Sequence, residues 1–174
     1  MSEALTIILK RNDPSAVAKQ VSLTELGSIK INKEERTQML KAIPRNSVIG
    51  FLIGVLPGAG ATIASFLAYG MERNFVSDEE KAKFGKGSVH GLTAPETANN
   101  AACSGAFVPL LTLGIPGSGT TAVMLGALLG FGIQPGPRLY ITNPEIFWSV
   151  IMSMYIGMVI LLILNLPLIP YIAR

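Results

Sequence analysis

Two short stretches, Leu56–Thr62 (LPGAGAT) and Ile115–Thr121 (IPGSGTT), decide how this sequence folds. Both read Pro-Gly-small-Gly-small-Thr, and each lies inside a long run of uncharged residues. Proline removes a backbone donor and clashes with the preceding helical turn, whereas glycine adopts backbone conformations that other residues resist. The repeat therefore predicts two helices that are broken near their middle, with Pro57 and Pro116 as the helix-breaking residues.

The runs around these motifs are long enough to cross a membrane. Residues 46–71, 97–137 and 146–173 contain no Asp, Glu, Lys or Arg, and a membrane-spanning helix needs about 20 mostly apolar residues. Charged residues make up only 14% of the chain, against about 25% in soluble domains. This composition excludes a soluble enzyme and a disordered chain. It predicts an all-α, polytopic integral membrane protein with broken or re-entrant helices at the Pro-Gly motifs.

The charge pattern divides the chain into six predicted parts. They are a polar, partly helical extramembrane flank (1–45), a broken membrane helix (46–70), a polar loop with a short helix (71–96), a broken membrane helix or helical hairpin (97–133), a Pro/Gly turn (134–145) and a transmembrane helix (146–173). Asn32 and Glu35 form an N-cap pair for a short helix that Pro44 ends. Eight of the 14 Lys and Arg residues precede Asn46, which favours a cytoplasmic flank. Whether residues 46–70 span the bilayer or re-enter it stays open.

The breaks are also the predicted binding site. Unpaired backbone groups are too costly in lipid unless they face protein or a water-filled cavity, and paired interrupted segments are typical of the binding sites of secondary transporters. The start of each second half-helix offers free N–H groups and a partial positive charge, which suit a carboxylate. The predicted substrate-binding residues are Gly58, Gly60, Thr62, Asn99, Asn100, Gly117, Ser118, Gly119, Thr120 and Thr121.

Simpler interpretations compete at several of these positions. Gly50, Gly54 and Gly58 are four residues apart, a spacing that lets helices pack closely without any ligand. Glu96 shares a helix face with two amide side chains at the edge of an apolar run, so it is the candidate for ion coupling. Thr93 and Glu96 also match a capping box at a helix start. Both interpretations of Glu96 stay open.

Catalytic and metal chemistry lack the necessary residues. The chain has one histidine and one cysteine, too few for a transition-metal cluster. His90 is predicted to be a loop residue, and Cys103 a small packing residue in an apolar run. Both aspartates, Asp13 and Asp78, lie in polar stretches, which excludes a Ser-His-Asp triad within the membrane. We therefore expect neither an enzyme, nor a bound cofactor, nor a nucleic-acid partner.

Five strings, in this order, resemble the large permease subunit of the tripartite tricarboxylate transporters, the TctA-type family. They are Gly50–Tyr69, Phe84–Gly87, Ala94–Ala101, Pro109–Thr121 and Gly132–Pro137. The resemblance implies a multi-pass permease of the bacterial inner membrane that takes up citrate or related carboxylates by symport with sodium or protons. It also implies a small membrane subunit and a periplasmic solute-binding protein as partners. The Pro-Gly motifs and the string from Pro95 to Asn100 are then expected along the substrate path.

The chain departs from this family pattern in two respects. The family's permeases are much longer and have two related halves, and this chain resembles a central portion. The alternative function is therefore a truncated fragment that does not transport and serves only as a structural or interaction piece of the membrane complex. His90 stands where many relatives are expected to have an acidic residue, which weakens a charge role for that position.

Overall fold

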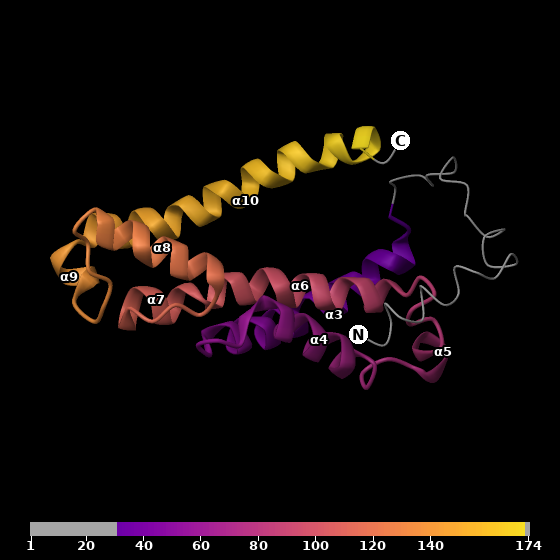
Figure 1. Cartoon of the computed structure of the whole chain (residues 1–174). Coiled ribbons are helices and arrows are strands. Elements are labelled where there is room, and N and C mark those ends of the chain that lie inside the picture. Colours follow the sequence, from indigo (N-terminus) through magenta and orange to yellow (C-terminus); the bar gives the residue numbers. More distant parts are fainter. Residues whose placement is uncertain (1–30, 173–174) are drawn as a thin grey trace, which may run out of the picture. The chain divides into compact units, whose positions relative to one another are not determined.

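The computed structural model describes residues 31–172, with side chains as far as residue 168. Residues 1–30 of the predicted flank lie outside this range. The helices are α3 (Lys33–Val55), α4 (Gly60–Glu72), α5 (Asp78–Lys81), α6 (Val89–Gly105), α7 (Phe107–Leu113), α8 (Gly119–Gly130), α9 (Leu139–Thr142) and α10 (Pro144–Ile172). Residues 31–172 contain no strand, which confirms the all-α prediction for this part of the chain (Figure 1).

The chain reverses direction at Leu56–Ala59, so α3 and α4 form a helical hairpin. The amide of Asn46 in α3 donates to the carboxylate of Glu72 at the end of α4, at 2.8 Å. The C-terminal end of α4 thus lies beside the middle of α3. At about 1.5 Å per residue, the 13 residues of α4 give the hairpin an arm roughly 20 Å long.

The beginning of α3 follows the predicted cap, but its end does not. Asn32 and Glu35 form the expected capping box. The helix then runs through Pro44 to Val55, so the prediction that Pro44 ends a short helix is wrong. Ala42 and Asn46, on either side of the proline, are fully buried. Tertiary packing on this face of the helix outweighs the backbone hydrogen bond that proline removes.

The central helix is α6, which contacts both arms of the hairpin through small residues (Figure 1). A Cβ atom added to Gly50 or Gly54 of α3 would overlap the backbone of Ala98 or Ala102, respectively. On the α4 side, the two α6 alanines form a buried cluster with two alanines of the hairpin, Ala64 and Ala68. The packing interpretation of the Gly50 and Gly54 spacing is therefore confirmed.

The start of α6 lies earlier than the sequence indicated. Ser88 is the N-cap, and its hydroxyl accepts from the Gly91 N–H at 3.0 Å. Thr93 and Glu96 thus lie inside the helix, and their prediction as a capping box is wrong. His90 lies in the first turn and is buried, so its prediction as a loop residue is also wrong. The proline at position 95 is again an internal helix residue.

The second break follows α7. Gly114 ends this helix in the left-handed conformation (φ 71°). A Cβ atom at Gly117 would lie 3.2 Å from the Cβ of Ala106 and 3.5 Å from the carbonyl oxygen of Gly54. The segment after α7 therefore returns to the α6–α7 junction before α8 begins. The first turn of α8 thereby starts next to the tip of the α3–α4 hairpin.

The last helix, α10, begins at Pro144, two residues before the start of the predicted transmembrane helix. Within residues 31–172, the segment Pro144–Leu168 is the one helix that is both long and apolar enough to cross a membrane. Residues 30–156 form one compact unit, and α10 from Gly157 onward belongs to a second, which we describe by itself.

The contact between α3 and α6 makes a testable prediction about stability. We expect Gly54→Ala to destabilise the protein by about 1–3 kcal/mol or more, because the new methyl group overlaps the Ala102 backbone. Gly70→Ala is the matched control, since a Cβ atom at this α4 position has nothing within 4 Å and alanine favours helix by about 0.5–1 kcal/mol. Thermal unfolding in detergent, followed by circular dichroism, measures both. Equal midpoints for the two variants would contradict the close packing.

Candidate functional site

The two Pro-Gly motifs interrupt their helices where the repeat predicts, but the glycines act differently in the two breaks. In the first break Gly58 (φ 83°) and Gly60 (φ 67°) adopt left-handed conformations that L side chains resist. In the second break Gly117 and Gly119 have no positive φ. Gly117 instead lies close to the α6–α7 junction, where an added Cβ atom would be in tight contact with Ala106. The same sequence motif thus supports a sharp turn in one place and a tight backbone contact in the other.

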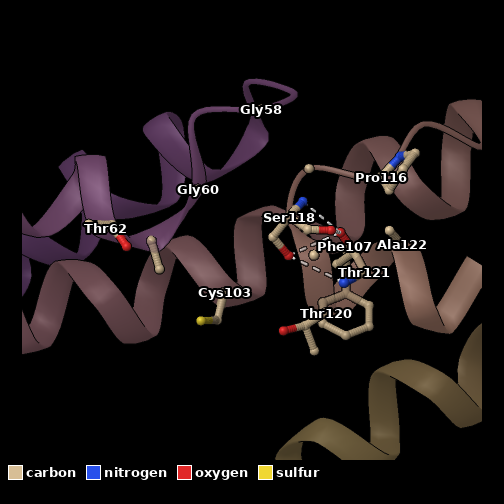
Figure 2. A pocket seen from close by; sticks show the side chains of 13 residues that line it. Gly58, Gly60, Thr62, Cys103, Phe107, Pro116, Ser118, Thr120, Thr121 and Ala122 are labelled. Carbon is tan, nitrogen blue, oxygen red and sulfur yellow. Dashed lines mark hydrogen bonds between the residues drawn. The ribbon is translucent and has the colours of Figure 1, made fainter.

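A cavity of about 700 Å³ opens between the two breaks (Figure 2). This volume lies within the range of about 300–1,000 Å³ that is usual for small-molecule sites. The lining residues are Gly58, Gly60, Ala61, Thr62, Cys103, Phe107, Pro116, Gly117, Ser118, Gly119, Thr120, Thr121 and Ala122. None of these described lining residues is charged, so an anion here meets only hydroxyl groups and backbone dipoles.

Two helix N-termini border this cavity. Gly60 begins α4, whose N-cap residue, Ala59, provides no side-chain hydrogen bond. Gly119 begins α8, next to the cavity-lining Ser118. Because the first N–H groups of a helix have no partner within it and carry a partial positive charge, both helices present donors to the same space.

The hydroxyl groups around the cavity fall into two classes. Ser118 and Thr121 form a capping box at the start of α8: the Ser118 N–H donates to the Thr121 hydroxyl at 2.8 Å, and the Thr121 N–H donates to the Ser118 hydroxyl at 3.3 Å (Figure 2). These two hydroxyls therefore shape the helix start. Thr62 and Thr120 are exposed at the cavity, and their hydroxyls are the better placed to meet a ligand.

The lining residues that the sequence did not predict are Ala61, Cys103, Phe107 and Ala122, of which Cys103 and Phe107 lie on α6 and α7. Cys103 is exposed and lines the cavity, so its prediction as a packing residue is wrong. Phe107 contributes an aromatic wall from the start of α7. Neither residue belongs to a Pro-Gly motif. Their distance from Pro116 along the sequence does not reveal that they line the cavity, because the chain turns at Ala106 and again at Gly114.

Comparison with known proteins decides the family. The model of the tripartite tricarboxylate transporter TctA family matches residues 1–174. The chain belongs to the TctA family. Its relatives include two Agrobacterium vitis proteins, an "uncharacterized 52.8 kDa protein in TAR-I ttuC' 3'region" (40% identical over 159 residues, 91% of this chain) and an "uncharacterized protein in TAR-II ttuC' 3'region" (49% identical over 120 residues, 69% of this chain). No solved structure matches the chain.

The TctA-family chain is shorter than these relatives. The aligned residues span 31% of the first relative and 49% of the second. The family is one of transporter components, and membership is consistent with the expectation that the chain is not an enzyme.

Glu96, Asn99 and Asn100 do not line the cavity of this TctA-family chain. The Asn99 amide donates to the Ser65 hydroxyl at 3.2 Å and so connects α6 to α4. Asn100 is exposed and donates to the Glu96 carbonyl oxygen at 2.9 Å, within its own helix. The Glu96 side chain is exposed as well. The structure thus separates these residues from the two breaks, and their substrate and ion roles stay predictions.

A buried acid that the sequence did not single out lies at the other end of α4. The side chain of Glu72 is fully buried. Its carboxylate accepts hydrogen bonds from Arg45 Nε (3.1 Å) and Nη2 (2.5 Å), from Asn46 Nδ2 (2.8 Å) and from His90 Nδ1 (2.7 Å). The guanidinium group of Arg45 also lies 4.3 Å from the ring centre of Phe75. We call the four residues Arg45, Asn46, Glu72 and His90 the Glu72 cluster.

Hydrogen bonding determines the charge state of the Glu72 cluster. Burial by itself raises the pKa of the Glu72 carboxyl. The donors from Arg45, Asn46 and His90, together with the positive charge of Arg45, outweigh this effect and hold the pKa below its ordinary value of 4.5. Glu72 is therefore ionised at neutral pH and forms an ion pair with Arg45.

The lowered pKa of Glu72 predicts how stability depends on pH. The stabilisation by the ionised carboxylate is present above pH 4.5 and is lost as pH falls through the lowered folded-state pKa. We therefore expect the unfolding midpoint of the wild type to fall steeply in this acidic range. Glu72→Gln should lower the midpoint at pH 7 and flatten its dependence below pH 4.5.

Thermal unfolding in detergent between pH 7 and pH 3 measures this effect. Glu96→Gln is the matched control, because this acid is exposed on α6 and should leave the wild-type profile nearly unchanged. If the unfolding midpoint of the Glu72→Gln variant fell just as steeply below pH 4.5, other carboxyl groups would determine the loss of stability in acid.

Proposed function

We propose that the cavity between the two breaks binds the carboxylate substrate of a tripartite carboxylate transporter. The observation that carries this proposal is the meeting of two helix N-termini, those of α4 and α8, at one cavity with uncharged described walls. Backbone N–H groups and helix dipoles at such termini stabilise anions. Broken helices whose N-terminal ends meet an anionic group are typical of secondary transporters.

The absence of a cation among the described lining residues also fits transport. A buried arginine that pairs with the substrate would be left unpaired when the substrate departs, at a large cost in free energy. Partial charges from two helix ends, with the hydroxyls of Thr62 and Thr120, hold a carboxylate without this penalty. The site can therefore bind an anion and release it on the other side of the membrane.

The hairpin suggests how the cavity lies in the membrane. Arg45 of α3 and Arg73, just after α4, lie at the open end of the hairpin, because Arg45 pairs with Glu72. We infer that residues 46–70 re-enter the membrane and do not span it, with both flanks on the cytoplasmic side. An arm of roughly 20 Å is long enough for the hairpin tip and the cavity to lie inside a hydrocarbon core about 30 Å thick.

The remainder of the proposal follows from the family. We infer a multi-pass protein of the bacterial inner membrane, with α10 crossing the bilayer. A small membrane subunit and a periplasmic solute-binding protein are the proposed partners, citrate or a related carboxylate is the proposed substrate, and sodium or protons supply the driving gradient. Because the chain spans about a third to a half of its relatives, uptake is proposed for the longer protein.

Cys103 provides a direct test of binding, since it is the one cysteine in the sequence and lines the cavity. We expect citrate to slow the reaction of Cys103 with a maleimide in a saturable manner, because a bound carboxylate covers the thiol. The measurement is the labelling rate of the membrane-inserted chain at increasing citrate concentration, with sodium or with potassium. Equal concentrations of sulfate report nonspecific salt effects.

The matched control moves the thiol away from the cavity. In a Cys103→Ala, Asn74→Cys variant, the thiol lies in the exposed turn after α4, so citrate should not change its labelling rate. A Cys103 rate that no citrate concentration alters, in correctly inserted chain, would refute carboxylate binding by these residues alone.

A second prediction concerns the shape of the cavity. We expect Gly119→Leu to reduce citrate binding at least tenfold, because position 119 lines the cavity and has open space that the side chain would fill. Gly60→Leu should also abolish binding, but it adds strain at a positive φ, so Gly119→Leu is the cleaner variant. Gly126→Leu is the control, since this α8 position is equally open and does not line the cavity. Radiolabelled citrate binding measures all three, and normal binding by the Gly119 variant would contradict the assignment.

A further inference from the structure

We propose that Glu72 is a positioning residue for the candidate site, and that the Glu72 cluster sets where the N-terminus of α4 stands in the cavity. The expected effect on citrate binding rests on the proposed function. The position of α4 itself can be tested without any ligand. Glu72 and Gly60 are the two ends of the same helix. One end is held by the Glu72 cluster, and the other end forms the cavity wall.

The Glu72 cluster joins three helices at one buried carboxylate. Arg45 and Asn46 come from α3 and His90 comes from α6, while Glu72 ends α4. Four donor groups converge on two oxygen atoms: Oε1 accepts from Arg45 Nη2 and His90, and Oε2 accepts from Arg45 Nε and Asn46. This directional set of bonds fixes α4 both along its axis and around it.

Much of the remaining contact between α4 and α6 is made by small residues. The buried cluster between α4 and α6 consists of Ala64 and Ala68 against Ala98 and Ala102. Such small side chains allow close approach but do not interlock as large ones do. One further polar contact lies along the seam, where the Ser65 hydroxyl donates to the Pro95 carbonyl oxygen at 3.2 Å and accepts from Asn99. The Tyr69 ring adds an edge-to-face contact with the Phe84 ring, at a centroid distance of 5.2 Å. Among the polar contacts that hold α4 in its axial position, the Glu72 cluster is the largest.

A buried ion pair of this kind is sensitive to the loss of one charge. Replacing the carboxylate by an amide leaves the Arg45 guanidinium without its counter-ion and brings an N–H donor against the existing donors. We expect α4 to move in response, because its alanine seam allows it. The displacement then appears at Gly60, Ala61 and Thr62, which line the cavity.

The test compares Glu72→Gln with a charge exchange, Arg45→Glu with Glu72→Arg. The exchange keeps one positive and one negative side chain in the cluster. The Asn46 Oδ1 atom is buried and has no partner among the described residues, so a flipped Asn46 amide offers this oxygen to the guanidinium group introduced at position 72. Glu79→Gln, a change to an exposed acid of α5, is the control.

The first readout is the maleimide labelling rate of Cys103 in the inserted chain without citrate. We expect Glu72→Gln to change this rate at least threefold, the charge exchange to return it toward the wild-type value, and Glu79→Gln to leave it unchanged. The second readout is the citrate concentration that protects Cys103 by half, which should rise at least tenfold in Glu72→Gln and recover in the exchange variant.

Each outcome has a defined meaning. A Glu72→Gln variant that inserts normally and keeps the wild-type rate and half-protecting concentration overturns the positioning role. If that variant does not insert, His90→Ala replaces it, because one donor is lost while the Arg45 pair remains; an unchanged labelling rate there overturns the proposal equally. Rates that respond to the cluster while citrate never protects the wild type would refute carboxylate binding and leave the positioning role supported.

Discussion

The fold depends on how closely the backbone of α6 approaches α3. At Gly50 and Gly54 no side chain fits between the two helices, since a Cβ atom would overlap the α6 backbone. Dispersion contacts between closely packed backbones substitute for the hydrophobic effect where the surroundings are themselves apolar. The carbonyl oxygen of Gly54 also lies beside Gly117 of the second break. The same glycine that brings α3 onto α6 thus brings the two breaks together, and the cavity exists because of this contact.

Local features of this architecture could be predicted from the sequence. Proline and glycine act on the backbone through neighbouring residues, so the breaks at Pro57 and Pro116 fall within the predicted motifs. The cap at Asn32 is likewise a short-range arrangement and is confirmed. The long apolar helix from Pro144 follows directly from composition. In all these cases the interaction that determines the structure spans only a few residues.

The features that could not be predicted depend on contacts between distant residues. Pro44 and Pro95 lie inside helices because packing on other faces maintains them, and no local signal reports this packing. No local signal distinguishes Glu72 from the polar segment around it, although it bonds Arg45, Asn46 and His90 across 27, 26 and 18 residues of sequence, respectively. Cys103 and Phe107 line the cavity because the segment after α7 returns to the α6–α7 junction. Conversely, Asn99 and Asn100 match a polar face on a helix, yet one connects two helices and the other is exposed.

The hairpin formed by α3 and α4 also has a mechanical consequence. The hairpin is closed at the Pro57 turn, and the Glu72 cluster fixes its open end. If α4 tilts about Glu72, its other end at Gly60 moves most, because the two ends are roughly 20 Å apart. A tilt of about 10° at Glu72 moves the Gly60 end by roughly 3 Å, a distance comparable to one hydrogen bond. Small rearrangements among these four polar side chains are therefore amplified at the cavity, where they would decide whether a backbone N–H group reaches the anion that we propose to bind there.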